Sequence, residues 1–231
     1  MRDFISAACG ILIGCAVPAA AEQVVVVELY TSQGCSSCPP ADELLATLAS
    51  DPRIIPLALH VDYWDYIGWA DSFAQAKFTT RQKAYAHAEG SRTIYTPQLI
   101  IGGQDRIEGN APSETKAQLK RHLAAAETLQ LTVERQGDTL VIHADAQPAL
   151  KGAVLVQLVR YLPEATVDIG RGENAGRTIT YRNIVTSWDT VTEWSGQQPL
   201  DLTETVKGSQ PVVVILQAAG PAEILAAARV E

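Results

Sequence analysis

Residues 24–42 read VVVVELYTSQGCSSCPPAD, an apolar run followed by the CxxC motif Cys35-Ser36-Ser37-Cys38. The near-continuous apolar run is typical of a β-strand that is covered on both faces. Two cysteines at this spacing, placed where such a strand gives way to a helix, are the arrangement of a thiol–disulfide redox centre. The alternative is a small structural disulfide, whose closed loop is too short to stabilise the fold much.

The two cysteines are expected to have different roles. Cys35 lies nearest the start of the expected helix, where unpaired backbone N–H groups and the helix dipole favour a thiolate. We therefore expect Cys35 to be the attacking thiolate, and Cys38 to be more buried and to resolve the mixed disulfide. Pro39 and Pro40 are tolerated only in a first helical turn, so the regular helix should begin near Ser37.

Two further residues are expected beside this motif. Thr96-Pro97 stands immediately before an apolar run at 99–101, and the order resembles that of thioredoxin-like proteins, in which a cis proline faces the disulfide. Glu28 is an acidic residue inside the first apolar run. Burial there would disfavour its charged form, so Glu28 could relay a proton to or from Cys38. The alternative is that Glu28 pairs with a cation or faces solvent at a strand edge.

Strand and helix signals alternate through residues 24–127, which predicts an α/β thioredoxin-like domain over 22–128. Strands are expected at 24–30, 54–61, 98–101 and 106–108, and helices at 42–49, 72–88 and 113–127. After residue 128 helical periodicity is largely absent. Strands expected at 129–134, 139–144, 154–161, 178–186, 190–194 and 212–217 predict an all-β sandwich-like domain over 129–231, packed against the first.

Two loop segments each have two possible roles. The aromatic segment 63–69 could wall the disulfide, or could simply pack against the second domain. Segment 170–177 contains three glycines and two arginines, but its spacing is not that of a phosphate loop, and a hairpin loop is expected. Its arginines could still reach toward the CxxC motif.

Residues 1–21 have the features of an export signal, with an apolar stretch at 4–17 and a small-residue cleavage site at 19–21. The alternative is a lipoprotein signal in which Cys15 is lipidated. Either route places the protein in the periplasm or outside the cell, where disulfides persist. Only lipidation at Cys15 would attach it to a membrane.

The composition argues against some classes of binding partner. The 231 residues carry a formal net charge of −8 with no basic run, which argues against nucleic acid and anionic membrane surfaces. No cofactor is expected. His60 could complete a soft-metal site for Cu(I) or Zn with the two thiolates, but its place in an apolar strand favours an ordinary packed histidine.

Long motifs resemble the bacterial secreted family of domain-of-unknown-function 1223. They are ELYTSQGCSSCPPAD at 28–42, LHVDYWDYIGW at 59–69, FTTRQKAY at 78–85, YTPQLIIGG at 95–103 and GENAGRTITYRN at 172–183. The resemblance implies a thioredoxin-like domain followed by a β-rich domain, and carries no established activity. The wider similarity to thioredoxins assigns the nucleophile to Cys35, the resolving thiol to Cys38 and the cis proline to Pro97, with Glu28 a less certain match.

These features predict an exported thiol–disulfide oxidoreductase. Its partners would be protein or small-molecule thiols and disulfides, with a redox partner that the sequence does not identify. The alternative is a binding module, either a non-catalytic thioredoxin-like domain or a thiolate carrier of copper.

Overall fold

A computed structural model describes residues 24–125 and 129–230. The predicted export signal and Cys15 lie outside these residues. In the ranges that are described, no helix is both long enough and apolar enough to cross a membrane.

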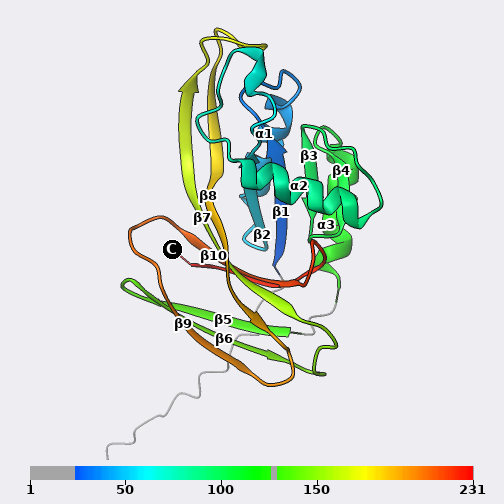
Figure 1. Ribbon diagram of the computed structural model, residues 1–231, viewed down its shortest axis with the longest axis vertical. Helices are drawn as coiled ribbons and strands as arrows, with labels where there is room; N and C mark the ends of the chain where they lie inside the picture. The colour runs from blue at the N-terminus through cyan, green and yellow to red at the C-terminus, as the bar shows by residue number, and fades with distance from the viewer. Residues whose placement is uncertain (1–23, 126–128, 231) are drawn as a thin grey trace, which may run out of the picture.

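The first half of the chain alternates strands and helices (Figure 1). Its elements are β1 (Val25–Thr31), α1 (Pro39–Leu48), β2 (Ile54–His60), the short 3-10 helix η1 (Asp65–Ile67), α2 (Ala76–Ala88), β3 (Gln98–Ile101), β4 (Asp105–Glu108) and α3 (Pro112–Leu123). β1 pairs in parallel with β2 and antiparallel with β3, so these strands lie in the order β2-β1-β3-β4. α1 begins at Pro39, between the start near Ser37 expected from the prolines and the helical pattern expected from residue 42. α2 begins at Ala76, later than the predicted residue 72.

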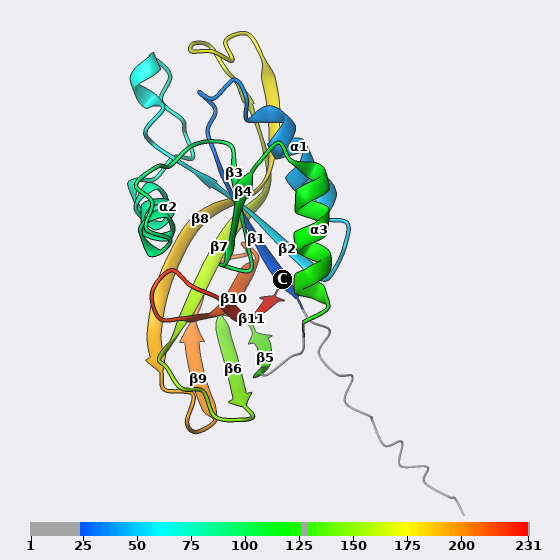
Figure 2. The ribbon, with the colours of Figure 1, turned by 90° about the vertical axis from the view of Figure 1, so that its right-hand side faces the viewer.

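Helices cover both faces of β1 and β2, which explains their near-continuous apolar sequences (Figure 2). Val25, Val27 and Leu29 point to one face and form a core with α1 and α3. Val26 and Tyr30 point to the other face and form a core with α2. The period of two along β1 therefore decides which helix each side chain meets.

The second half is entirely β. Its strands are β5 (Leu129–Gln136), β6 (Thr139–Ala146), β7 (Val154–Asp168), β8 (Thr178–Trp194), β9 (Leu200–Thr205), β10 (Val212–Ala218) and β11 (Ile224–Val230). Four of these strands extend the first sheet into an eight-stranded sheet of order β11-β10-β7-β8-β2-β1-β3-β4, and the other three form a separate sheet of order β5-β6-β9. The protein is thus a mixed α/β structure with a large, mostly β sheet and few helices.

The boundary expected near residue 128 does not divide the large sheet. β8 pairs in parallel with β2 through Ala58 and Ile184, and the Asn183 side chain donates a 2.9 Å hydrogen bond to the carbonyl of Pro56. The three-stranded sheet packs against the far end of the large sheet around a second apolar core, which includes Leu140 and Val214. β7 and β8 come from the second half of the chain but lie in the large sheet next to β2. The hairpin that they form therefore reaches the CxxC motif.

Candidate functional site

The site is built around a disulfide between Cys35 and Cys38. Cys38 is the N-cap residue of α1, and Pro39 and Pro40 occupy the first helical positions, where no intrahelical N–H bond is lost. The N–H of Cys38 donates to the carbonyl of Cys35 at 3.2 Å, which closes a tight turn before the helix. Both cysteines are fully buried, so the expected difference in their exposure is absent, whereas Ser36 and Ser37 between them are exposed.

Pro97 lies against the start of α1. The Thr96–Pro97 peptide bond is cis, as predicted. A Cβ atom at Gly109 would stand 2.6 Å from the Cβ of Pro97 and 3.0 Å from that of Ala41, so only glycine allows these segments to meet. One residue further on, Asn110 donates a 2.9 Å hydrogen bond to the carbonyl of Ser37. The segment before β3 and the segment after β4 therefore both border the CxxC turn.

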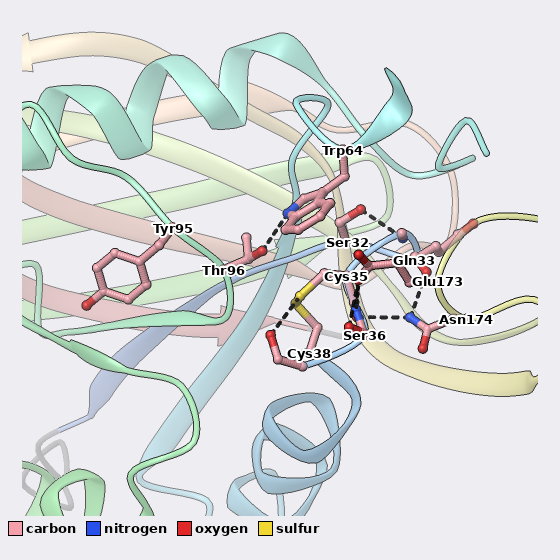
Figure 3. The surroundings of a disulfide bond; sticks show 12 residues. Ser32, Gln33, Cys35, Ser36, Cys38, Trp64, Tyr95, Thr96, Glu173 and Asn174 are labelled. Carbon is pink, nitrogen blue, oxygen red and sulfur yellow. Dashed lines mark hydrogen bonds between the residues drawn. A yellow bond between two sulfur atoms is a disulfide. The ribbon is translucent and has the colours of Figure 1, made fainter. Parts of the chain in front are cut away.

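The aromatic segment 63–69 covers the CxxC turn on another side (Figure 3). The indole of Trp64 donates a 2.7 Å hydrogen bond to the hydroxyl of Thr96. A Cβ at Gly34 would stand 3.2 Å from the Cβ of Trp64, so this loop lies directly on the residue before Cys35. Tyr66 stacks on Trp64 at 6.5 Å and is 82% exposed. The segment thus packs against the residue before Cys35 through Trp64 and presents the ring of Tyr66 to solvent.

The tip of the β7–β8 hairpin covers Cys35 from the second half of the chain. The Asn174 side chain is buried and donates to the carbonyls of Gln33 and Cys35, each at 2.9 Å. Glu173 accepts hydrogen bonds from the N–H and the hydroxyl of Ser36, at 3.3 and 2.6 Å. The prediction for this loop concerns its arginines, but the residues that contact the motif are Glu173 and Asn174, and Arg177 donates to the side-chain oxygen of Asn174 at 3.0 Å. The sequence places Glu173 and Asn174 in a turn but does not predict their contacts with the motif, since both residue types are common in loops.

Glu28 does not lie beside the cysteines. Its side chain is fully buried, and Arg81 donates to both carboxylate oxygens at 2.8 Å, while Tyr30 and Tyr85 donate at 2.9 and 2.7 Å. Because Glu28 alternates with Val27 and Leu29, it points to the α2 face of the sheet, whereas α1 covers the opposite face. Glu28 therefore pairs with a cation, which is the alternative expectation. The expected proton relay between Glu28 and Cys38 is wrong, because the carboxyl points to the opposite face of the sheet.

Arg81 connects the ion pair to the second half of the chain. Its guanidinium lies 3.8 Å from the ring centre of Trp188 on β8 and donates to Gln217 on β10 at 3.0 Å. The negative charge of Glu28 raises the pKa of Arg81 even though burial alone would lower it. The cluster around Arg81 connects α2, β1, β8 and β10, so its role is to hold the two halves of the chain together.

His60 is a buried histidine at the end of β2. Its Nδ1 lies 2.7 Å from a carboxylate oxygen of Asp71, and the same oxygen accepts from the N–H of Gln33 at 2.8 Å. This arrangement links His60 to the segment that leads into the CxxC motif. Within residues 24–125 and 129–230, no three His, Cys, Asp or Glu side chains are grouped as metal ligands.

Comparison with known proteins gives a family and a fold. No curated protein matches the chain. A crystal structure of protein AGR_C_4864 from Agrobacterium tumefaciens is 33% identical, covers 91% of this chain and 96% of that one, and superposes with a TM-score of 0.78. HBP35 of Porphyromonas gingivalis is 12% identical with a TM-score of 0.66, covering 90% of this chain and 75% of that one, which is a likeness of fold alone.

The family model described as "Protein of unknown function (DUF1223)" matches residues 26–217. This range begins in β1, includes the CxxC turn, Pro97 and the β7–β8 hairpin, and ends in β10. The chain belongs to the DUF1223 family.

Proposed function

We propose that this protein is an exported thiol–disulfide oxidoreductase that acts on protein or small-molecule disulfides. The observation that carries the proposal is the Cys35–Cys38 disulfide, held in the turn between β1 and α1 with Pro97 against the same helix start. A strand, a CxxC turn and a helix in this order are the arrangement of thiol–disulfide exchange proteins.

The surrounding topology supports a thioredoxin-like fold around the site. The strand order β2-β1-β3-β4, with a parallel first pair and α1 and α3 on one face, resembles the thioredoxin core. In this protein the sheet continues beyond β2 into β8 and β7. The extension brings Glu173 and Asn174 to the disulfide, so we infer that the second half controls access to it.

The proposed reaction is thiol–disulfide exchange between the Cys35–Cys38 disulfide and two substrate thiols. A substrate thiolate attacks the sulfur of Cys35, the Cys35–Cys38 bond breaks, and the sulfur of Cys38 leaves with the electron pair and takes up a proton. A second thiolate attacks the substrate sulfur of the mixed disulfide, which releases Cys35 and oxidises the substrate. The reverse sequence reduces a substrate disulfide, and the reduction potential decides which direction prevails.

Both cysteines are fully buried, so the substrate has to reach Cys35 past exposed residues. Ser36 and Ser37 are exposed, and the hydrogen bonds from Ser36 to Glu173 lie at the surface. Exposed hydrogen bonds contribute little net stability because water replaces them. We infer that the tip of the β7–β8 hairpin moves away from Ser36 when substrate binds. Export, with cleavage after the signal or lipidation at Cys15, is part of the proposal, because an oxidising compartment suits this chemistry.

The test is a pair of measurements on the purified protein. Equilibration with glutathione buffers should give a reduction potential within about −270 to −120 mV, the span of active CxxC proteins. Reduced protein should cleave the disulfides of insulin, Cys35→Ser should abolish this cleavage, and Cys38→Ser should trap mixed disulfides through Cys35. A potential below about −300 mV together with no insulin cleavage would identify a structural disulfide instead. Tight stoichiometric Cu(I) binding without exchange activity would favour the metal-carrier alternative.

A further inference from the structure

Polar atoms without a protein hydrogen-bond partner gather between α1 and the sheet. In the described part of the chain, they are the hydroxyl of Thr31, both carboxylate oxygens of Asp42, Nε2 of His60 and the hydroxyl of Tyr181. All four residues are at least nine-tenths buried. Leaving such a group unsatisfied costs about 1–3 kcal/mol, so several together call for an explanation.

Strand pairing, a ring contact and the packing of α1 place these four residues near one another. Thr31 and His60 are the last residues of β1 and β2 and are directly paired in the parallel register. Both alternate with residues that pack against α1, so both point to the α1 face. Tyr181 on β8 meets the His60 ring edge-on at 4.9 Å between ring centres. Asp42 belongs to the first turn of α1, which packs on this face, and both of its carboxylate oxygens are buried.

Asp42 lies one helical turn after Cys38. The N–H of Asp42 donates to the carbonyl of Cys38 at 3.1 Å, so the two residues are stacked along the helix axis. In an α-helix the side chains lean toward the N-terminus and over residue i−4. The carboxyl of Asp42 is therefore directed toward the resolving cysteine, from the face of the sheet that Glu28 does not reach.

The surroundings bring the pKa of the Asp42 carboxyl close to neutral pH. Burial raises the pKa of Asp42 to about 7, against the lowering effects of His60 on β2 and Thr31 on β1. Asp71 in the loop after η1 and Glu43 on α1 raise it further. A carboxyl whose pKa lies near the working pH is suited both to give and to accept a proton.

The orientation of His60 is fixed by Asp71. Burial raises the pKa of Asp71, but His60 and the N–H groups of Gln33 and Phe73 outweigh this effect and lower it below the usual value. Nδ1 of His60 is paired with Asp71, so Nε2 is the ring nitrogen without a hydrogen-bond partner.

We propose that Asp42 exchanges a proton with the sulfur of Cys38 during disulfide exchange. This inference rests on the proposed function. When a thiolate attacks Cys35, the Cys35–Cys38 bond breaks and the sulfur of Cys38 takes the proton of the Asp42 carboxyl. In the reverse step, the thiol of Cys38 returns that proton to the Asp42 carboxylate as its sulfur attacks the mixed disulfide at Cys35 and expels the substrate thiolate.

The experiment follows reduction of the disulfide in the full protein by excess dithiothreitol between pH 5 and 9. Samples are quenched by alkylation, and intact mass gives the reduced fraction. Asp42→Asn should reduce at least about tenfold more slowly near pH 6, at the modest end of general acid effects, and should lose the inflection near pH 7. Glu43→Gln is the matched control, because it removes an exposed carboxyl from the next position of the same helix. It should keep the wild-type rate near pH 6 and keep the inflection, moved only slightly to lower pH because Glu43 raises the pKa of Asp42. An Asp42→Asn profile identical to wild type would overturn the inference.

A second readout does not depend on how the variant folds. Infrared difference spectra of the wild-type protein should show the carbonyl band of a protonated carboxyl that disappears near pH 7 and shifts when the disulfide is reduced. A protein without such a band above pH 5 would also overturn the inference. If Asp42 controls reduction by dithiothreitol but insulin is not cleaved, the proposed function fails and the proton exchange stands. If insulin is cleaved but the Asp42→Asn profile is unchanged, the proposed function stands and the proton exchange fails.

Discussion

Asn174, at the tip of the β7–β8 hairpin, donates a 2.9 Å hydrogen bond to the carbonyl oxygen of Cys35, 139 residues earlier in the chain. The same amide donates to the carbonyl of Gln33. Two buried carbonyls on either side of Gly34 therefore depend on one side chain from the all-β half. The CxxC turn is a joint product of the two halves of the chain.

Removing this side chain should both destabilise the protein and open the disulfide. Asn174→Ala leaves the carbonyls of Gln33 and Cys35 without their partner, so we expect a loss of about 1–3 kcal/mol in the free energy of unfolding. Reduction by glutathione should become several-fold faster, because the cover over Cys35 is loosened. Denaturant titration and alkylation kinetics measure the two effects. Thr178→Ala, which removes an exposed hydrogen bond to Asp168 in the same hairpin, should change neither.

Breaking the buried ion pair should affect stability without affecting the chemistry. Arg81→Met leaves Glu28 as an uncompensated buried charge, so the free energy of unfolding should fall by about 3–5 kcal/mol. The rate of disulfide reduction per folded molecule should keep the wild-type pH profile, because Glu28 faces α2 and not α1. Arg182→Met, which breaks an exposed pair with Glu164, should cost less than about 1 kcal/mol. A shifted pH profile in Arg81→Met would restore a role for Glu28 in exchange.

Asp42 should make stability fall between mildly acidic and neutral pH. Its pKa is raised to about 7 in the folded protein from an ordinary value near 4, so the folded state binds the proton more tightly. The contribution of this proton to the free energy of unfolding is fully present below about pH 4 and is lost as pH rises toward 7. The loss is up to about 4 kcal/mol, since the pKa rises from near 4 to about 7. Urea titrations at several pH values should show this decline in wild type and a flatter profile in Asp42→Asn. Equal slopes in the two proteins would contradict the prediction.

Tyr66 should matter for large substrates only. Its ring is 82% exposed and stacks on Trp64 next to the CxxC turn, so it is placed to contact a protein chain that approaches Cys35. Tyr66→Ala should raise the KM for insulin several-fold and leave the rate with glutathione unchanged. Stability should stay within about 0.5 kcal/mol of wild type, as for most surface substitutions. Val141→Ala, at an exposed position on β6, is the control, and an equal effect on both substrates would contradict the assignment.

Local sequence is sufficient for the parts of the site that depend on short-range geometry. The apolar run that forms β1, the prolines that begin α1 and the cysteines between them follow from propensities and helix-end rules within a single stretch. Likewise, the cis Thr96–Pro97 bond is predicted from its order between the CxxC motif and the Gly102-Gly103 hairpin. Such features require few long-range contacts.

The sequence also identifies Glu28 as a buried acid but does not say which face of the sheet it occupies. Alternation along β1 divides the side chains into two sets, yet which helix covers each set depends on how the chain crosses over the sheet. Arg81, the partner of Glu28, lies 53 residues away on α2. Asp42 gives no signal in the sequence, because a single acid in the first turn of a helix is usually a solvent-exposed position that favours the helix dipole.

What the sequence by itself determined is therefore a strand, a CxxC turn, a helix and a proline that precedes the third strand. Tertiary structure alone decided that β8 pairs with β2, that the β7–β8 hairpin covers Cys35, and that side-chain polar atoms of Thr31, Asp42, His60 and Tyr181 are buried without a hydrogen-bond partner. The physical reason is that local rules fix dihedral angles and alternation, whereas strand pairing joins segments more than a hundred residues apart. Such pairing is selected by the total packing of both halves, which no short stretch of sequence encodes.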